Sequence, residues 1–361
     1  MVNIFNPEHD LCLANGDPNY VPPVSAVKFG IDCQEVVRII GGNDPVVAWG
    51  WDSVLKRHLV KSGCSEESLP SDAYIDVVKE LSHRKYALEA SVFVRENFSS
   101  VGYLAESGAE ELFSIEDVYS FLDRNESAVL KAPWSGSGKG LRWIKRYDIT
   151  DSDTGWCRKV ISAQGSVMAE RRQEVVRDFA ALFNITDTRV VFEGLSLFYT
   201  DNGAYRGNIL ASDEYILETL SDFVPSALIM ECVECLKVFL ERKFLGKYKG
   251  FAGVDMFICM TSGRYFLSPC VEINVRMTMG LLARRYYDNC FVCEHSGRDG
   301  EFVLEVVNAP DSALLVSKLS SAKTLLTTLR HDSLYAIAVF YQRSSVSNHF
   351  LRLQTAGSDC V

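Results

Sequence analysis

The fold is decided first by the stretch Ala128-Val129-Leu130-Lys131-Ala132-Pro133-Trp134-Ser135-Gly136-Ser137-Gly138-Lys139-Gly140, which continues as Leu141-Arg142-Trp143-Ile144. The pattern predicts an apolar strand that carries a lysine, then a loop of small residues, then a second strand. The backbone N–H groups of such a loop, together with a cation, suit phosphate groups. This stretch is therefore a candidate phosphate-binding flap.

A second stretch supplies acidic side chains. It begins Gly253-Val254-Asp255-Met256-Phe257-Ile258, turns at 261–263, and runs on to Glu272-Ile273-Asn274-Val275-Arg276. Glu272 and Asn274 are two residues apart on a predicted strand, so both side chains point to one face, and Asp255 can face them from the neighbouring strand. Mg²⁺ prefers such hard oxygen ligands. Pro269 implies a bulge or an edge position for the Glu272 strand, because proline cannot donate to a sheet ladder. The alternative is a merely polar strand face.

The bulk composition excludes several classes of protein. The chain has 361 residues, 47% hydrophobic and 23% charged, with a formal net charge of −10. This length suits two or three packed lobes, and the acidic balance argues against a nucleic-acid-binding surface. No signal peptide and no membrane-spanning run is predicted, so we expect a cytoplasmic protein that binds neither nucleic acid nor membrane, with its eleven cysteines as thiols.

The glycine-rich loop is not a P-loop. A P-loop has the order Gly, four residues, Gly-Lys-Ser/Thr and then a helix, whereas here Pro133 lies five residues before Gly138 and Gly140 follows Lys139. A strand on both sides favours a flap that closes over phosphates. An ordinary Gly/Ser hairpin turn is the alternative.

Local patterns predict an α/β (α+β) protein that starts with a small parallel α/β lobe. We expect strands over 2–5, 35–40 and 45–49, a helix over 52–61, helical structure over 75–98, and a polar loop over 6–23. Ser114 is the expected N-cap of a further helix. The later chain predicts antiparallel strands, a long helix over 225–244, a helix over 311–329 and a strand over 335–341.

In this order the parts resemble the ATP-grasp superfamily, over roughly residues 80–290. The matching elements are Lys85, Lys131, the loop Ser135, Gly136, Ser137, Gly138, Lys139, then Glu170, Asp255, Glu272, Asn274 and Arg276. The start of the chain is similar to uncharacterised bacterial ATP-grasp-like proteins that begin Phe-Asn-Pro-Glu-His-Asp. The resemblance implies two α+β lobes that clasp ATP, with an N-terminal lobe over 1–84, a small lobe over 85–165 and a large lobe over 166–361.

The resemblance also implies roles for these residues. Lys85 and Lys131 would neutralise phosphates, Glu170 would contact the adenosine, and Asp178 or Glu174 would take a ribose hydroxyl. Asp255, Glu272 and Asn274 would hold one or two Mg²⁺ ions, with Mn²⁺ as an alternative ion. Lys131 and Arg276 would be catalytic, with Arg276 stabilising the transferring phosphoryl group.

Four residues are candidates for the second substrate. Arg206 and Asn208 alternate along a strand that borders the acceptor site in the resemblance, although a plain surface arginine is an equal alternative for Arg206. His9 and Asn15 lie in the polar loop after the first strand, at the end of a sheet where α/β proteins bind ligands. A structural, turn-rich loop is the alternative there.

The resulting hypothesis is an ATP- and magnesium-dependent ligase that joins a small-molecule or peptide carboxylate to an amine through an acyl phosphate. The rivals are a kinase that phosphorylates a small metabolite and a nucleotide-binding regulatory protein without turnover. The sequence leaves open the identity of both substrates and whether the chain forms a homodimer.

Overall fold

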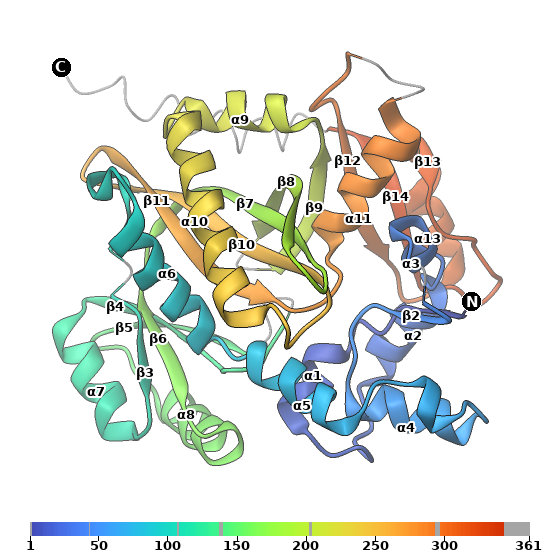
Figure 1. Cartoon of the computed structure of the whole chain (residues 1–361), viewed down its shortest axis with the longest axis horizontal. Coiled ribbons are helices and arrows are strands. Elements are labelled where there is room, and N and C mark those ends of the chain that lie inside the picture. Colours follow the sequence, from blue (N-terminus) through green and yellow to red (C-terminus); the bar gives the residue numbers. More distant parts are fainter. Residues whose placement is uncertain are drawn as a thin grey trace.

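The computed structural model describes residues 2–42, 44–106, 108–136, 140–201, 204–292 and 297–342. Three sheets organise these residues (Figure 1): a two-stranded sheet, a four-stranded sheet and an eight-stranded sheet. Each sheet belongs to a different part of the chain. Helices cover the sheets, and those of the N-terminal part pack against the large sheet.

The N-terminal part is a small parallel α/β unit. Strands β1 (Val2–Ile4) and β2 (Val46–Ala48) pair in parallel. The surrounding helices are α1 (His9–Asn15), α2 (Val24–Asp32), α3 (Val36–Ile40), α4 (Ser53–Lys61) and α5 (Asp72–Leu81), with a 3₁₀ turn η1 (Glu66–Ser68). The parallel lobe expected from the sequence is therefore present.

Two local predictions in this part are wrong. The run at 35–40, predicted as a strand, is the helix α3, whose Val36, Val37 and Ile40 are all buried. A short apolar run fits a buried helix as well as a buried strand, so periodicity alone does not separate them. The expected loop over 6–23 also contains α1, which ends at Gly16 with a left-handed φ of 76°.

The small sheet has the order β3-β6-β4-β5, with all neighbours antiparallel. Its strands are β3 (Glu110–Leu112), β4 (Ser127–Lys131), β5 (Leu141–Lys145) and β6 (Val167–Arg171). Helices α7 (Ile115–Arg124) and α8 (Asp151–Gln164) pack against it. Ser114 caps α7 as predicted, in a reciprocal capping box with Asp117.

The large sheet has the order β11-β10-β7-β8-β9-β12-β14-β13. Its strands are β7 (Glu174–Ile185), β8 (Val190–Asp201), β9 (Ala204–Leu210), β10 (Gly250–Thr261), β11 (Arg264–Asn274), β12 (Phe302–Asn308), β13 (Thr324–Leu325) and β14 (Tyr335–Tyr341). The further helical elements are α6 (Lys85–Asn97), η2 (Val101–Tyr103), α9 (Asp213–Ser221), α10 (Ser226–Phe244), α11 (Met279–Tyr286), η3 (Tyr287–Phe291), α13 (Ser312–Lys318) and η4 (Leu319–Ser321).

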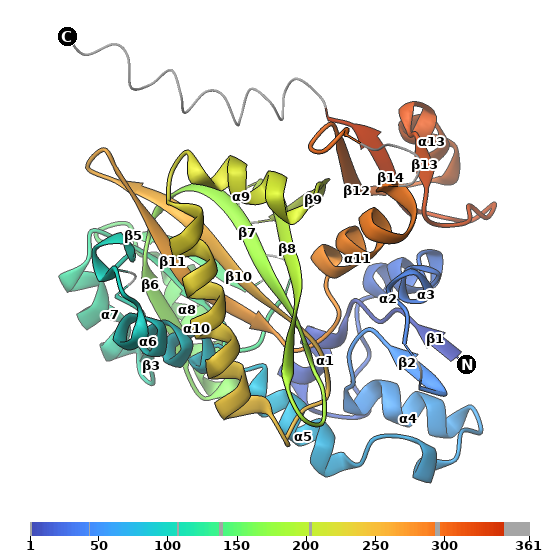
Figure 2. The same ribbon diagram turned by 45° about the horizontal axis from the view of Figure 1, so that its top comes forward.

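Both faces of the large sheet are buried by different helices. Phe179, Ala181 and Phe183 of β7 belong to the core beneath α6 and α10, whereas Ala180 and Leu182 belong to a second core with α11 and the N-terminal part. This alternation follows from the period of two in a strand. Figure 2 shows the N-terminal helices beside β10 and α11, opposite α10. The second face therefore points toward the N-terminal part.

The outcomes at the large sheet are mixed. The prediction of one helix over 311–329 is wrong. The helical structure consists of α13 and η4 and ends at Ser321, and Thr324 and Leu325 pair with β14 instead. The inference from Pro269 is confirmed: β11 is the edge strand, and the register with β10 shifts between Asp255 and Phe257. The shift lies directly beside the predicted metal ligands.

Candidate active site

Two carboxylates lie side by side on adjacent strands, with Asp255 in the middle of β10 and Glu272 near the end of β11. Asp255 is the direct cross-strand partner of Glu272, and Asn274 follows two residues later on the same face. The Asn274 amide Nδ2 donates to Asp255 Oδ2 at 3.1 Å. The structure therefore brings together the three residues that the sequence predicted as metal ligands.

Burial makes this carboxylate pair costly. Desolvation, and next the negative charge of Glu272, raise the pKa of Asp255 to about 7, although the hydrogen bond from Asn274 opposes the shift. Among the described residues, no group of three or more His, Cys, Asp or Glu side chains is arranged to hold a metal. Two carboxylates and one amide oxygen still suit Mg²⁺, which in nucleotide sites takes few protein ligands and completes its shell with phosphates and water.

Lys131 lies at the end of β4 and is 6% exposed. Its ammonium is 2.8 Å from Glu170 Oε1 on β6. Lys131, predicted to bind phosphate, and Glu170, predicted to contact the adenosine, therefore form an ion pair with each other. Burial raises the pKa of the Cys270 thiol, and so does electrostatic repulsion from nearby acidic groups, in the order Cys232, Asp255, Glu170 and Glu272. Glu170 of the small sheet and the carboxylates of the large sheet are thus within electrostatic range of one side chain.

Arg84, which the sequence prediction missed, connects the flap to the carboxylates. Its guanidinium donates to the Ala132 and Ser135 carbonyls at 3.0 Å each and lies 2.9 Å from Glu272 Oε1. The predicted residue, Lys85, points elsewhere: its ammonium is 2.6 Å from Glu80, and its side chain is 33% exposed. Successive residues on a helix are rotated by about 100° from each other. The sequence pattern therefore indicated the correct helix start, but the side chain that faces the carboxylates in the structure is Arg84 rather than Lys85.

Arg276 is held by Asp10 of the predicted polar loop, a contact that the sequence did not predict. Its Nε and Nη2 donate to the Asp10 carboxylate, with Nη2 2.8 Å from Oδ2, and Nη2 also donates to Asn274 Oδ1 at 2.9 Å. Asp10 belongs to α1 of the N-terminal part. Burial opposes its charge, but Arg276 holds the pKa of Asp10 below its ordinary value. A partner 266 residues away in sequence leaves no local signal.

The start of the flap touches the same carboxylate. A Cβ added to Gly136 would lie only 2.0 Å from Asp10 Oδ2, so this position has no space for a side chain. Ser135 is buried beside Arg84. Ser137, Gly138 and Lys139 of the predicted flap lie outside the described residues.

The predicted substrate residues of the N-terminal part are placed differently from one another. His9 is 1% exposed, and its Nδ1 is 3.2 Å from Asp52, which also accepts from Asn6 Nδ2. His9 therefore fixes the position of the segment that carries Asp10. Asn15 is exposed and accepts a hydrogen bond from the Asp17 backbone in a local turn.

The remaining predicted residues lie on β7 and β9. Asp178 shares the face of Asp255, because Asp255 pairs with Ala180 two residues further along β7. Its carboxylate accepts from the Thr200 hydroxyl at 2.9 Å. Asn208 is buried and donates to Ser196, whereas Arg206 is exposed. The structure thus places Asp178 on β7, next to the strand that carries Asp255. Arg206 and Asn208 lie on β9, which is two strands further from the carboxylates than β7.

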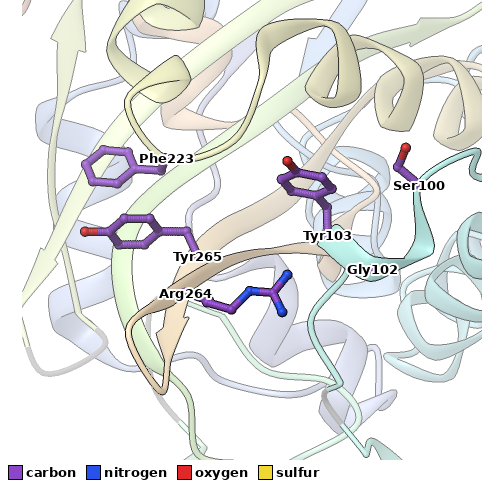
Figure 3. A pocket seen from close by; sticks show the side chains of 6 residues that line it. All are labelled: Ser100, Gly102, Tyr103, Phe223, Arg264 and Tyr265. Carbon is purple, nitrogen blue, oxygen red and sulfur yellow. The ribbon is translucent and has the colours of Figure 1, made fainter.

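A separate cavity of about 390 Å³ lies at the far end of the β10–β11 hairpin. Figure 3 shows Phe223 and Tyr265 on one side and Tyr103 and Ser100 on the other, with Arg264 between them. None of the predicted site residues lines it. It is therefore not the site built by Asp255 and Glu272.

The sequence matches no protein-family model and no curated protein. The fold, however, matches solved structures. An ADP complex of N5-carboxyaminoimidazole ribonucleotide synthetase aligns with a TM-score of 0.50 at 13% identity, over 97% of this chain and 94% of that chain. This chain has the ATP-grasp fold.

Two other ATP-grasp structures are similar. Biotin carboxylase from Campylobacter jejuni gives a TM-score of 0.49 at 11% identity, covering 83% of this chain and 72% of that chain. L-amino acid ligase from Bacillus licheniformis gives 0.44 at 11% identity, covering 89% and 82%. The alignment with the N5-carboxyaminoimidazole ribonucleotide synthetase structure confirms, for the fold, the ATP-grasp resemblance inferred from the sequence. A bilayer-spanning segment is absent from the described helices, since each is too short or too polar for that role.

Asp178 makes the folding stability of the protein depend on pH. Burial raises its pKa from 3.8 to about 6, so between these values the folded state keeps a proton that the unfolded state loses. Folding stability therefore falls as pH rises through this window. We expect Asp178→Asn to raise the free energy of unfolding by about 1–3 kcal/mol at pH 8 and by little at pH 4, as measured by urea titration.

The matched control is Asp123→Asn, because Asp123 is 75% exposed and its ion pair with Arg146 is long, at 3.7 Å. We expect a change of less than about 0.5 kcal/mol at either pH for this variant. An equal effect of Asp178→Asn at pH 4 and pH 8 would contradict the burial of an ionised carboxylate at this position.

Proposed function

We propose that this protein is an ATP- and magnesium-dependent carboxylate–amine ligase. The observation that carries the proposal is the convergence of Arg84, Arg276 and the flap on the Asp255–Glu272 pair, with Lys131 beside them, in an ATP-grasp fold. Phosphate groups need cations, and a phosphate-bridging metal needs adjacent carboxylates. The cations come from β4, the start of α6 and the segment after β11, and the carboxylates come from β10 and β11.

Each cation of this site has a carboxylate partner in the structure. Lys131 pairs with Glu170, Arg84 with Glu272, and Arg276 with Asp10. Buried charges of this kind are stable only when paired. The negative charge of a triphosphate would take over part of this pairing, and Glu272 and Asp255 would then be compensated by the metal. The charge balance of the site supports nucleotide binding.

In the proposed reaction, the substrate carboxylate attacks the γ-phosphorus of ATP, and ADP leaves. The resulting acyl phosphate is attacked by an amine, which forms the amide, loses a proton and releases phosphate. Mg²⁺ would screen the charge of the phosphate oxygens. Lys131 and Arg84 would neutralise the phosphates and Arg276 would stabilise the transferring group, so the residues act by positioning and electrostatics.

Two structure-based observations support this class among the alternatives. Among the compared structures, one is named an L-amino acid ligase and another an N5-carboxyaminoimidazole ribonucleotide synthetase. The Asp255–Glu272–Asn274 set is complete, which favours turnover over simple nucleotide binding. A product assay with ATP, Mg²⁺ and mixed amino acids separates a ligase, which forms an amide, from a kinase, which forms a phosphorylated metabolite.

Glu272→Gln tests the metal assignment. The amide keeps the size and still accepts a hydrogen bond from Arg84, but it loses the charge that a metal needs. We expect ATP turnover to fall by about 10²–10³-fold, with an unchanged melting temperature within a few degrees, measured by ADP release and thermal unfolding. Glu214→Gln, at an exposed position of α9, is the control and is expected to keep wild-type activity. Full turnover by Glu272→Gln would contradict the assignment of Glu272 as a metal ligand.

Arg84 and Lys85 form a matched pair of adjacent cations. Because Arg84 faces Glu272 and the flap while Lys85 faces Glu80, we expect only Arg84 to contribute to nucleotide binding. Calorimetric titration with MgADP should show about 10–100-fold weaker binding for Arg84→Gln and less than about twofold change for Lys85→Gln. The reverse ranking would show that Lys85 turns inward, as the sequence resemblance implied, when nucleotide binds.

A further inference from the structure

The N–H groups of Arg276 are almost fully used by the protein itself. Nε donates to Asp10 Oδ1 at 3.0 Å, Nη2 donates to Asp10 Oδ2 and to Asn274 Oδ1, and Nη1 donates to the Met277 carbonyl at 3.1 Å. A guanidinium has five N–H donors. The edge formed by Nε and Nη2 is the one that grips an anion with two parallel bonds, and Asp10 occupies it.

Asn274 is tied into the same arrangement. Its oxygen accepts from Arg276, and its Nδ2 donates to Asp255. This orientation turns the amide oxygen toward a guanidinium and presents N–H groups to the carboxylate. A divalent cation held by Asn274 and Asp255 needs the oxygen and the carboxylate to face one point, which both of these hydrogen bonds oppose.

Asp10 also lies where the flap begins. Gly136 approaches its carboxylate so closely that a Cβ would overlap Oδ2. A phosphate bound at the Nε/Nη2 edge of Arg276 would bring a second negative group against Asp10, and like charges in a partly buried site repel strongly. His9 and Asn6, anchored on Asp52, hold the segment that carries Asp10 in place.

We propose that the Asp10–Arg276 ion pair is a latch that the magnesium–nucleotide complex must open. Opening frees the Nε/Nη2 edge of Arg276 for a phosphate, lets the Asn274 oxygen turn to the metal, and releases α1 from the flap. Nucleotide binding and latch closure exclude each other. The latch thereby couples occupancy of the nucleotide site to the position of the N-terminal part. This inference rests on the proposed function, because it requires that the site binds MgADP or MgATP.

The first test is calorimetric titration of the full-length protein with MgADP. The wild type must spend part of its binding free energy on opening the latch, so Asp10→Asn should bind MgADP about tenfold more tightly. In an Arg276→Gln background the same Asp10→Asn change should have no effect, because the latch is already absent. Asp332→Asn is the control: Asp332 pairs with Lys28 of α2 on the surface, and its loss should leave the affinity unchanged.

The second test needs no variant. Hydrogen exchange of the wild type should become faster in residues 10–15 when MgADP is added, whereas a permanent Asp10–Arg276 pair predicts exchange that is unchanged or slower. Equal or weaker MgADP binding by Asp10→Asn, or slower exchange in α1 on addition of MgADP, overturns the latch alone. If the wild type and all variants fail to bind MgADP, the proposed function is wrong and the latch falls with it.

Discussion

The site depends on one constraint, which is that Asp255 and Glu272 are held directly opposite each other on adjacent strands within a largely buried face. Two neighbouring carboxylates in such a place repel and lose hydration, so they need cations or protons. Arg84 and, through Asn274, Arg276 supply positive charge. Arg84 in turn fixes the start of the flap, and Arg276 fixes α1. Compensating this pair therefore adds polar contacts to the apolar packing that joins the N-terminal part to the large sheet.

Patterns that are local in sequence predicted much of the fold. The strand–loop–strand around Lys131, the cap at Ser114 and the edge position implied by Pro269 depend on residues within a few positions of each other, and each is present. The parallel start of the chain and the antiparallel later part were also predicted. The run at 35–40 was predicted wrongly because it is too short for its period to be decisive. The stretch 311–329 does begin as a helix, but Thr324 and Leu325 pair with the distant strand β14 instead of continuing it.

The positions of the charged side chains of the site were predictable only where a strand determines the direction in which they point. Asp255, Glu272 and Asn274 lie together because strand periodicity determines which side chains share a face. At the start of α6, a shift of one residue separates Arg84 from Lys85 and sends them to different partners. The Asp10–Arg276 pair joins chain segments 266 residues apart, and no spacing rule relates them. Tertiary packing, rather than local pattern, decides these contacts.

The central claim is that one nucleotide lies between the cations Lys131, Arg84 and Arg276 and the carboxylates of β10 and β11. A crystal structure with a bound, non-hydrolysable ATP analogue and Mg²⁺ tests this most directly. The account predicts the phosphates between Lys131, Arg84 and Arg276, with the metal on Asp255 and Glu272. An analogue bound elsewhere, with the Lys131–Glu170 and Arg84–Glu272 pairs unchanged, would contradict it.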